Sequence, residues 1–168
     1  GRKLRVLAVG EVGLRKGAHY VYQVARRFAQ HAEFRMVGPV GLLPGRGQEL
    51  SRHVQVSGSV PRSEVIRHFD WADVFLLPSL CEGSATVTYE ALAAGLPVIA
   101  TPNTGSIVED GISGFIVPAR DSDAIVNAFE RLLSDPSLLS EMGAAAHARS
   151  REGSLEAYGE RLMQALES

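Results

Sequence analysis

Short apolar segments alternate with longer amphipathic segments over the first two-thirds of the chain, and this alternation predicts strands followed by helices. Strands are expected at residues 4–9, 34–37, 54–57, 73–78, 97–101 and 114–117. Helices are expected at residues 18–30, 61–69 and 85–94, with a shorter one at 104–109. After residue 121 the pattern is helical throughout, in three segments that break near residues 135–136 and 152–153.

Strands that alternate with helices are typical of a parallel sheet, so the sequence predicts an α/β fold. We expect a single Rossmann-like domain with a doubly wound, mostly parallel sheet and a helical C-terminal tail. Residues 38–47 contain four glycines and two prolines, which predicts a mobile loop. Ligands bind such sheets beyond the carboxyl ends of the strands, where the turns at 10–17, 58–61 and 101–106 and the turn around Glu82 should converge.

The composition is that of a globular domain of 168 residues, 45% hydrophobic and 21% charged. Its net charge of −2 disfavours nucleic acid as a partner, because nucleic-acid-binding domains are usually basic. The single cysteine, Cys81, favours a reducing compartment, and we expect a cytoplasmic protein. No apolar run has the length of a membrane span, and no signal peptide is visible. Because the chain begins at Gly1 and enters a strand almost at once, we interpret it as a piece of a longer protein.

The turn from Gly10 to Gly17 follows the first predicted strand and opens the first predicted helix. Its glycine spacing fits neither the dinucleotide-binding fingerprint nor the P-loop. The turn ends in Arg15-Lys16-Gly17, so two cations lie at a helix N-terminus, where the helix dipole disfavours positive charge. This placement indicates a bound anion, and a diphosphate would suit; the alternative is a solvated Arg-Lys pair in a loop.

Two glutamates, Glu82 and Glu90, flank the start of the helix that follows the fourth predicted strand. Glu82 lies in the turn, and Glu90 lies more than one helical turn further on, so the two carboxylates reach groups in front of the helix tip and along its flank. Backbone N–H groups at the helix N-terminus favour an anion. A nucleotide sugar, with phosphates in the middle and hydroxyls at both ends, fits this pattern. Alternatively, Glu82 only stabilises the helix N-terminus and Glu90 is an exposed helix residue.

Four further features have simpler interpretations. Asp121 precedes a helix, which favours an N-cap over a metal-binding Asp-x-Asp pair. The histidines show no metal-ligand spacing, and His19 is the one nearest the predicted site. Cys81 has no evident base partner, which favours a small buried side chain over a nucleophile. The last helix carries an apolar stripe that should cover something apolar, formed by Leu155, Tyr158, Leu162 and Leu166.

Two long segments of this chain resemble the hallmarks of family-4 glycosyltransferases, which are retaining enzymes of the GT-B fold. The first is LAVGEVGLRKGAHYVYQVA, a strand and a turn that ends in Lys-Gly, and the second is PSLCEGSATVTYEALAAGLPVIATPNTGSIVEDGISGFIVP. Between them, VQVSGSV matches a third motif, and the resemblance runs in register from about Leu4 to Val117. It covers the C-terminal, donor-binding half of the two-domain enzyme; the N-terminal, acceptor-binding half is absent from this chain.

The resemblance implies roles for individual residues. Lys16 matches the lysine that holds the donor diphosphate, and Glu82 matches a glutamate that contacts donor-sugar hydroxyls near the reacting carbon, so both are expected to be catalytic. Glu90 matches the glutamate that binds the ribose, and the backbone near Val60 matches a nucleobase contact. The turn whose amides meet sugar and phosphate corresponds to Gly83, Ser84, Ala85 and Thr86.

This chain departs from the family pattern at two places. Many members have an arginine directly after the first glycine, which is Gly10 here, and this chain has Glu11 instead. We expect Gly10 to border the donor and Arg15 to supply the missing charge. The sequence Ser84-Ala85-Thr86 also replaces the Phe-Gly-Leu of many members, which predicts a different sugar pocket.

The resemblance implies a hexosyltransferase that uses a UDP-, GDP- or ADP-sugar without a cofactor or metal, because cations and a helix dipole can stabilise the departing diphosphate. The expected partner is the N-terminal acceptor domain of the same protein, and any contact with the inner membrane face would come through that half. Alone, the chain should bind the donor without turnover. A nucleotide-sugar epimerase of the same fold and a non-catalytic binding module remain open as alternatives. The glycine spacing disfavours a dinucleotide-dependent oxidoreductase.

Overall fold

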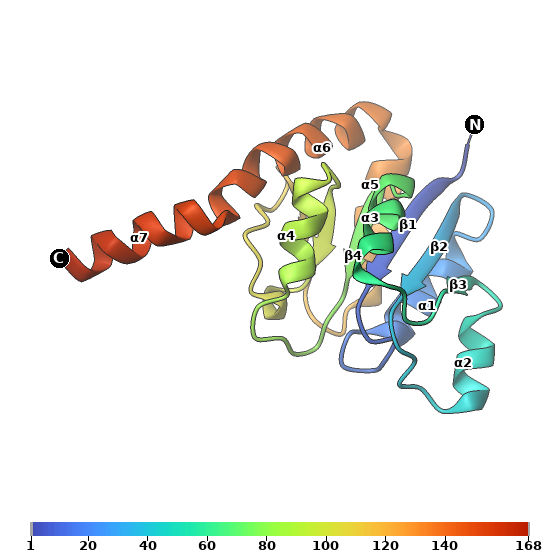
Figure 1. The fold of residues 1–168 in the computed structure, drawn as a ribbon. Coiled ribbons are helices and arrows are strands. Elements are labelled where there is room, and N and C mark those ends of the chain that lie inside the picture. The colour runs from blue at the N-terminus through green and yellow to red at the C-terminus, as the bar shows by residue number, and fades with distance from the viewer. Residues whose placement is uncertain (1, 168) are drawn as a thin grey trace.

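The centre of the protein is a parallel sheet of six strands in the order β3-β2-β1-β4-β5-β6 (Figure 1). The computed structural model describes the backbone of residues 2–167 and their side chains except those of residues 155, 158, 160, 161 and 167. The strands are β1 (Leu4–Val9), β2 (Ala32–Val37), β3 (Val54–Val56), β4 (Val74–Leu77), β5 (Val98–Ala100) and β6 (Gly114–Ile116). Each neighbouring pair is parallel, so the predicted α/β, doubly wound, Rossmann-like fold is confirmed.

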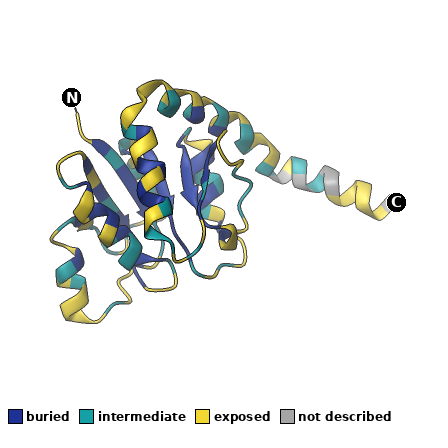
Figure 2. Cartoon of the chain, turned by 180° about the vertical axis from the view of Figure 1, so that it is seen from behind, coloured by how far each residue is buried: buried dark blue, intermediate teal, exposed yellow. Residues whose placement is uncertain are grey.

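Helices cover both faces of the sheet (Figure 1). One face carries α1 (Ala18–Arg27) and α5 (Ser122–Ser134), and the other carries α3 (Arg62–Trp71) and α4 (Thr86–Ala93). Successive side chains of a strand point to opposite faces, so Val6 of β1 joins the core under α1 and α5 while Leu7 joins the core under α3 and α4. Because helices lie on both faces, β4 and β5 are buried at every position, and Figure 2 shows the strands in the colour of buried residues.

The C-terminal part is helical, as predicted, in three segments. After α5, α6 (Pro136–Ser150) packs against α4, and a 3₁₀ turn (Arg151–Gly153) leads into α7 (Leu155–Glu167), which extends away from the body (Figure 1). The break before α6 has a local cause, because the Asp135 side chain accepts hydrogen bonds from the backbone N–H groups of Ser137 and Leu138. Within the described chain, no helix combines the length and apolar character needed to cross a membrane.

The glycine-rich segment 38–47 is not a loop throughout, and this part of the prediction is wrong. A helix, α2 (Pro44–Leu50), begins inside it. Pro44 occupies the first turn, where its fixed φ angle suits a helix and its missing N–H is not needed. Leu50 at the other end of α2 is buried in the core, so tertiary packing stabilises a helix that local glycine content disfavours.

Two other helix predictions also differ from the structure. The helix expected at 104–109 is absent, and only a 3₁₀ turn (Pro102–Thr104) forms there. The backbone beyond it is engaged elsewhere, since the Ile107 carbonyl accepts from Arg149 and the Glu109 N–H donates to the Ser113 hydroxyl. The first helix ends at Arg27 rather than residue 30, because β2 already starts at Ala32.

Candidate functional site

The turn between β1 and α1 holds Lys16 in place through a glycine. Gly10 has a φ angle of +129°, and a Cβ atom added there would lie 2.7 Å from Cε of Lys16. The absence of a side chain at Gly10 therefore leaves room for the aliphatic part of Lys16, which is 13% exposed. The Lys16 ammonium group is thus positioned at the carboxyl end of β1.

This turn is joined to the end of β4. Gly17, the N-cap of α1, has a φ angle of +76°, and a Cβ there would collide with the Pro78 carbonyl oxygen. The Leu80 N–H also donates to the Arg15 carbonyl at 2.8 Å. The two turns lie at the switch point of the sheet, where the strand order reverses between β1 and β4. Ligands of doubly wound folds bind at such a point.

Glu82 lies between both cations of the first turn. Its Oε1 accepts from Lys16 Nζ at 2.8 Å and from the Ser79 hydroxyl at 3.1 Å. Its Oε2 accepts from the Arg15 guanidinium at 3.0 Å. The anion expected beside these cations is therefore supplied, at least in part, by a side chain of the protein itself.

Glu82 is ionised by its partners although it is largely buried, with 8% of its side chain exposed. Burial by itself would raise the pKa of this carboxyl. The hydrogen bond and positive charge of Lys16, with contributions from Ser79 and Arg15, outweigh burial and lower the pKa below its ordinary value. The carboxylate is consequently a fixed negative charge at the switch point.

A cavity of about 1010 Å³ opens beside these residues at the carboxyl edge of the sheet. Its walls come from the β1–α1 turn, from α3, from the turn around Glu82 and from α4. The structure brings together here the predicted residues Gly10, Lys16, Val60, Glu82, Ser84, Ala85, Thr86 and Glu90. Apolar side chains of Val65 and Phe69 complete part of the wall, a mixture that small-molecule sites usually show. Arg15 and Gly83 do not line this cavity, and Arg15 reaches Glu82 from the solvent side.

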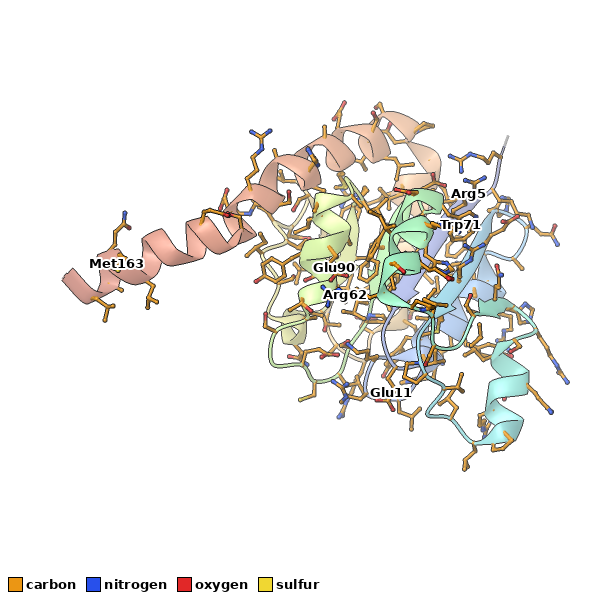
Figure 3. All side chains as sticks on the ribbon, in the orientation of Figure 1. Arg5, Glu11, Arg62, Trp71, Glu90 and Met163 are labelled. Atoms are coloured by element: carbon orange, nitrogen blue, oxygen red, sulfur yellow. The ribbon has the colours of Figure 1, made fainter. Side chains whose placement is uncertain are left out.

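The second glutamate, Glu90, faces the same cavity from the flank of α4. Its carboxylate is 41% exposed and pairs with the Arg62 guanidinium of α3 at 3.3 Å, as the two labelled side chains in Figure 3 illustrate. Arg62 is 94% exposed and also lines the cavity. An exposed ion pair of this kind contributes little to stability, so the Glu90 carboxylate remains accessible to a polar ligand.

The turn from Gly83 to Thr86 offers fewer free amides than its sequence suggests. The Ala85 N–H donates to the Thr104 carbonyl at 2.9 Å, and the Thr86 N–H lies 3.1 Å from the Ser84 carbonyl. Gly83 and Ser84 are exposed, whereas Ala85 is buried. The contact with Thr104 fixes the turn against the segment after β5.

Sequence reasoning missed two residues of this site, Ser79 and Arg62. Ser79 is fully buried and its hydroxyl orients Glu82, while its own carbonyl accepts from the Thr101 hydroxyl at 2.6 Å. A polar residue directly after a buried strand was the available signal. Arg62 gave no comparable signal, because only the packing of α3 beside α4 places it opposite Glu90.

The lesser features have mixed outcomes. Asp121 is an N-cap as predicted, since its side chain accepts from the Ala124 N–H. The prediction that Cys81 is buried is wrong: its side chain is exposed, because the turn that carries it projects from the sheet edge. His19 lines another cavity, of about 610 Å³, between α1 and α2, so the structure does not bring it to the Glu82 site. Among the described residues, no group of three or more His, Cys, Asp or Glu side chains could hold a metal ion.

The sheet order and the cavity at its switch point define a Rossmann-like, ligand-binding α/β domain. A family model described as glycosyl transferases group 1 matches residues 3–135. The chain therefore belongs to this glycosyltransferase family, and its fold is that of the C-terminal domain of GT-B enzymes.

Individual relatives agree with this assignment. The chain is 31% identical over 146 residues to the amylovoran biosynthesis glycosyltransferase AmsK of Erwinia amylovora, covering 77% of this chain and 36% of AmsK. The structure of Anabaena HepE with UDP-glucose superposes with a TM-score of 0.83 at 19% identity, over 99% of this chain and 49% of HepE. The C-terminal domain of the Francisella tularensis group 1 protein LpcC gives a TM-score of 0.77 at 20% identity, over 87% of this chain and 83% of that domain. The chain spans about a third of the length of the curated relatives it matches first.

Proposed function

We propose that this chain is the donor-binding half of a retaining glycosyltransferase, which moves a hexose from a nucleoside-diphosphate sugar to an acceptor. The observation that carries the proposal is that Lys16, Glu82 and Glu90 border one cavity at the switch point of the sheet. The cavity offers a cation between two carboxylates, which complements a diphosphate between a sugar and a ribose. The HepE structures, whose printed names include UDP and UDP-glucose, support a ligand of this class.

In this proposal each residue has a distinct task. Lys16 and Arg15 bind the diphosphate, and Glu82 accepts hydrogen bonds from the donor sugar. Glu90 binds the ribose hydroxyls, and the backbone near Val60 meets the nucleobase. The turn formed by Gly83, Ser84, Ala85 and Thr86 borders the sugar and phosphates, with Gly10 beneath them.

The proposed chemistry is the departure of the nucleoside diphosphate from the anomeric carbon. The bond from this carbon to the diphosphate oxygen breaks, and its electron pair leaves with the diphosphate, whose growing charge Lys16 and Arg15 stabilise. The acceptor hydroxyl oxygen bonds to the anomeric carbon on the same face, and its proton passes to the departing phosphate. Glu82 positions the sugar and forms no covalent intermediate. The cations and the N-terminus of α4 carry out the stabilisation without a divalent metal.

The acceptor site and the transfer activity belong, in this proposal, to an intact protein that adds an N-terminal acceptor domain. Its proposed location is the cytoplasm, with any contact to the inner membrane face made by that domain. The isolated chain binds the donor and does not transfer it. Its partners are thus the nucleotide sugar and the other half of the protein, and nucleic acid is not among them.

The experiment that tests the proposal is a thermal-shift series with UDP, GDP, ADP and the sugar derivatives of each. A ligand at 100 times its dissociation constant stabilises the folded state by about 2.7 kcal/mol, which gives a readily measured shift. We expect one nucleobase series to raise the melting temperature. If no nucleoside diphosphate or nucleotide sugar raises it, the donor-binding assignment fails. For the full-length protein, the anomeric configuration of the product then tests retention, and 2-epimerised donor would indicate an epimerase instead.

A further inference from the structure

The two cations assigned to the donor diphosphate are both bonded to the same carboxylate. Lys16 Nζ lies 2.8 Å from Oε1 of Glu82, and the Arg15 guanidinium lies 3.0 Å from Oε2. Both oxygens of Glu82 are therefore engaged by the groups that a diphosphate would need. An anion that binds these cations must compete with Glu82.

Burial makes this competition significant. The side chains of Lys16 and Glu82 are 13% and 8% exposed, so water screens their attraction less than at an open surface. A second carboxylate, Glu11, lies 4.0 Å from Arg15. Within this group of four side chains the positive and negative charges balance, so a diphosphate gains little net attraction while Glu82 stays in place.

The carboxylate is also held by a rigid neighbour. Ser79 is fully buried, and its hydroxyl donates to Oε1, the same oxygen that accepts from Lys16. The Thr101 hydroxyl in turn donates to the Ser79 carbonyl. These bonds fix Glu82 toward the cations rather than toward the open part of the cavity.

We propose that Glu82 is an internal competitor of the diphosphate, which the hydroxyls of the donor sugar draw away from Lys16 and Arg15. The sugar and the diphosphate then bind cooperatively, because hydroxyls that donate to Glu82 release the cations for the phosphates. A nucleoside diphosphate without sugar has no such donors and binds against the competition of Glu82. The device favours binding of the intact donor over retention of the product diphosphate. This inference rests on the proposed function of the site.

The test compares inorganic diphosphate, the nucleoside diphosphate and its sugar derivative by isothermal titration. Glu82→Gln and Glu82→Ala remove the competing charge, so we expect each to bind inorganic diphosphate and the nucleoside diphosphate about tenfold more tightly, or about 1.4 kcal/mol. The sugar should add less affinity in these variants than in the unmodified chain. Ser79→Ala keeps the charge but loses the hydroxyl that holds Glu82, and should tighten diphosphate binding by about threefold.

Two controls separate this exchange from a general change of charge. Glu11→Gln removes a nearby carboxylate that does not touch Lys16, and Glu130→Gln removes a distant one on α5. We expect less than a threefold effect from the first and none from the second. Equal or weaker diphosphate binding by folded Glu82 variants would overturn the inference. If these variants do not fold, unchanged or weaker binding by Ser79→Ala overturns it.

The two proposals fail in different ways. If the unmodified chain binds a nucleoside diphosphate and loss of the Glu82 charge does not tighten it, the exchange is wrong and the donor site stands. If no nucleoside diphosphate binds, yet Glu82→Gln gains affinity for inorganic diphosphate, the exchange stands and the donor assignment is wrong.

Discussion

The aliphatic part of Lys16 occupies the space in which a side chain of residue 10 would lie, so Gly10 is a structural requirement for the position of that cation. A Cβ at residue 10 would come within 2.7 Å of Lys16 Cε and 2.8 Å of its Cδ. The far end of the lysine is flexible and can move aside, but it would then leave its contact with Glu82.

Replacing Gly10 with alanine should therefore weaken nucleoside-diphosphate binding by about tenfold, because the ammonium group is displaced. The change also strains the backbone, since φ at residue 10 is +129°. Gly111→Ala is the matched control: φ there is +76°, and nothing lies within 4 Å of the added Cβ. Both variants should lose stability in denaturant unfolding, but only Gly10→Ala should lose ligand affinity in titration calorimetry.

Lys16→Ala should weaken binding of the nucleoside diphosphate by at least about tenfold while binding of the nucleoside changes little, because a charge-assisted hydrogen bond contributes about 1.5–3 kcal/mol. Lys3→Ala is a suitable control, since Lys3 donates to the Ala29 carbonyl near the opposite edge of the sheet. Equal losses for nucleoside and nucleoside diphosphate would contradict the phosphate role of Lys16.

Glu90→Gln should impair binding of ribonucleotides by about tenfold and hardly affect the 2′,3′-dideoxy analogues, because its carboxylate is proposed to accept from ribose hydroxyls. Glu130→Gln removes a comparable ion pair: Glu130 lies 3.2 Å from Arg27 and is 50% exposed, against 3.3 Å and 41% for Glu90 with Arg62. Competition binding with both nucleotide types measures the difference. A loss of affinity shared by both types would make Glu90 a structural residue.

Stability at acid pH should depend on Glu82. Its pKa in the folded state is lower than the ordinary value of 4.5, so its contribution to stability is complete above that value and is lost as the pH falls through the folded-state pKa. In Glu82→Gln the free energy of unfolding should fall less steeply with pH below about 4.5, by up to about one proton. Ser79→Ala, which removes one of the causes of the lowered pKa, should give an intermediate slope. Urea unfolding at a series of pH values measures it, and identical slopes in all three proteins would disprove the coupling.

The last helix should be weakly protected in hydrogen exchange and should promote self-association. Its Leu162, Met163 and Leu166 are 45%, 56% and 73% exposed, whereas the side chains of Leu155 and Tyr158, which complete the predicted stripe, lie outside the described residues. We expect sugar transfer only when the N-terminal half is restored. Strong protection of α7 in a dilute monomer, or transfer by this chain alone, would contradict the half-enzyme interpretation.

The sequence by itself determined the fold class, the strands and the residues that form most of the cavity. Buried strands read directly from apolar runs, and β1 (Leu4–Val9) was predicted at its observed bounds because helices cover both its faces. Lys16, Glu82 and Glu90 could be found because they follow strands, and the carboxyl ends of parallel strands meet at one edge.

Only the tertiary structure decided how the side chains pair. The bonds from Lys16 and Arg15 to Glu82 join positions 66 or more residues apart, and local pattern carries no information about such contacts. The same reason explains Arg62 opposite Glu90, and the helix α2, which its buried Leu50 stabilises against the preference of its glycines. Periodicity records which face of an element is buried, whereas the partner of each charge depends on where the packed elements bring it.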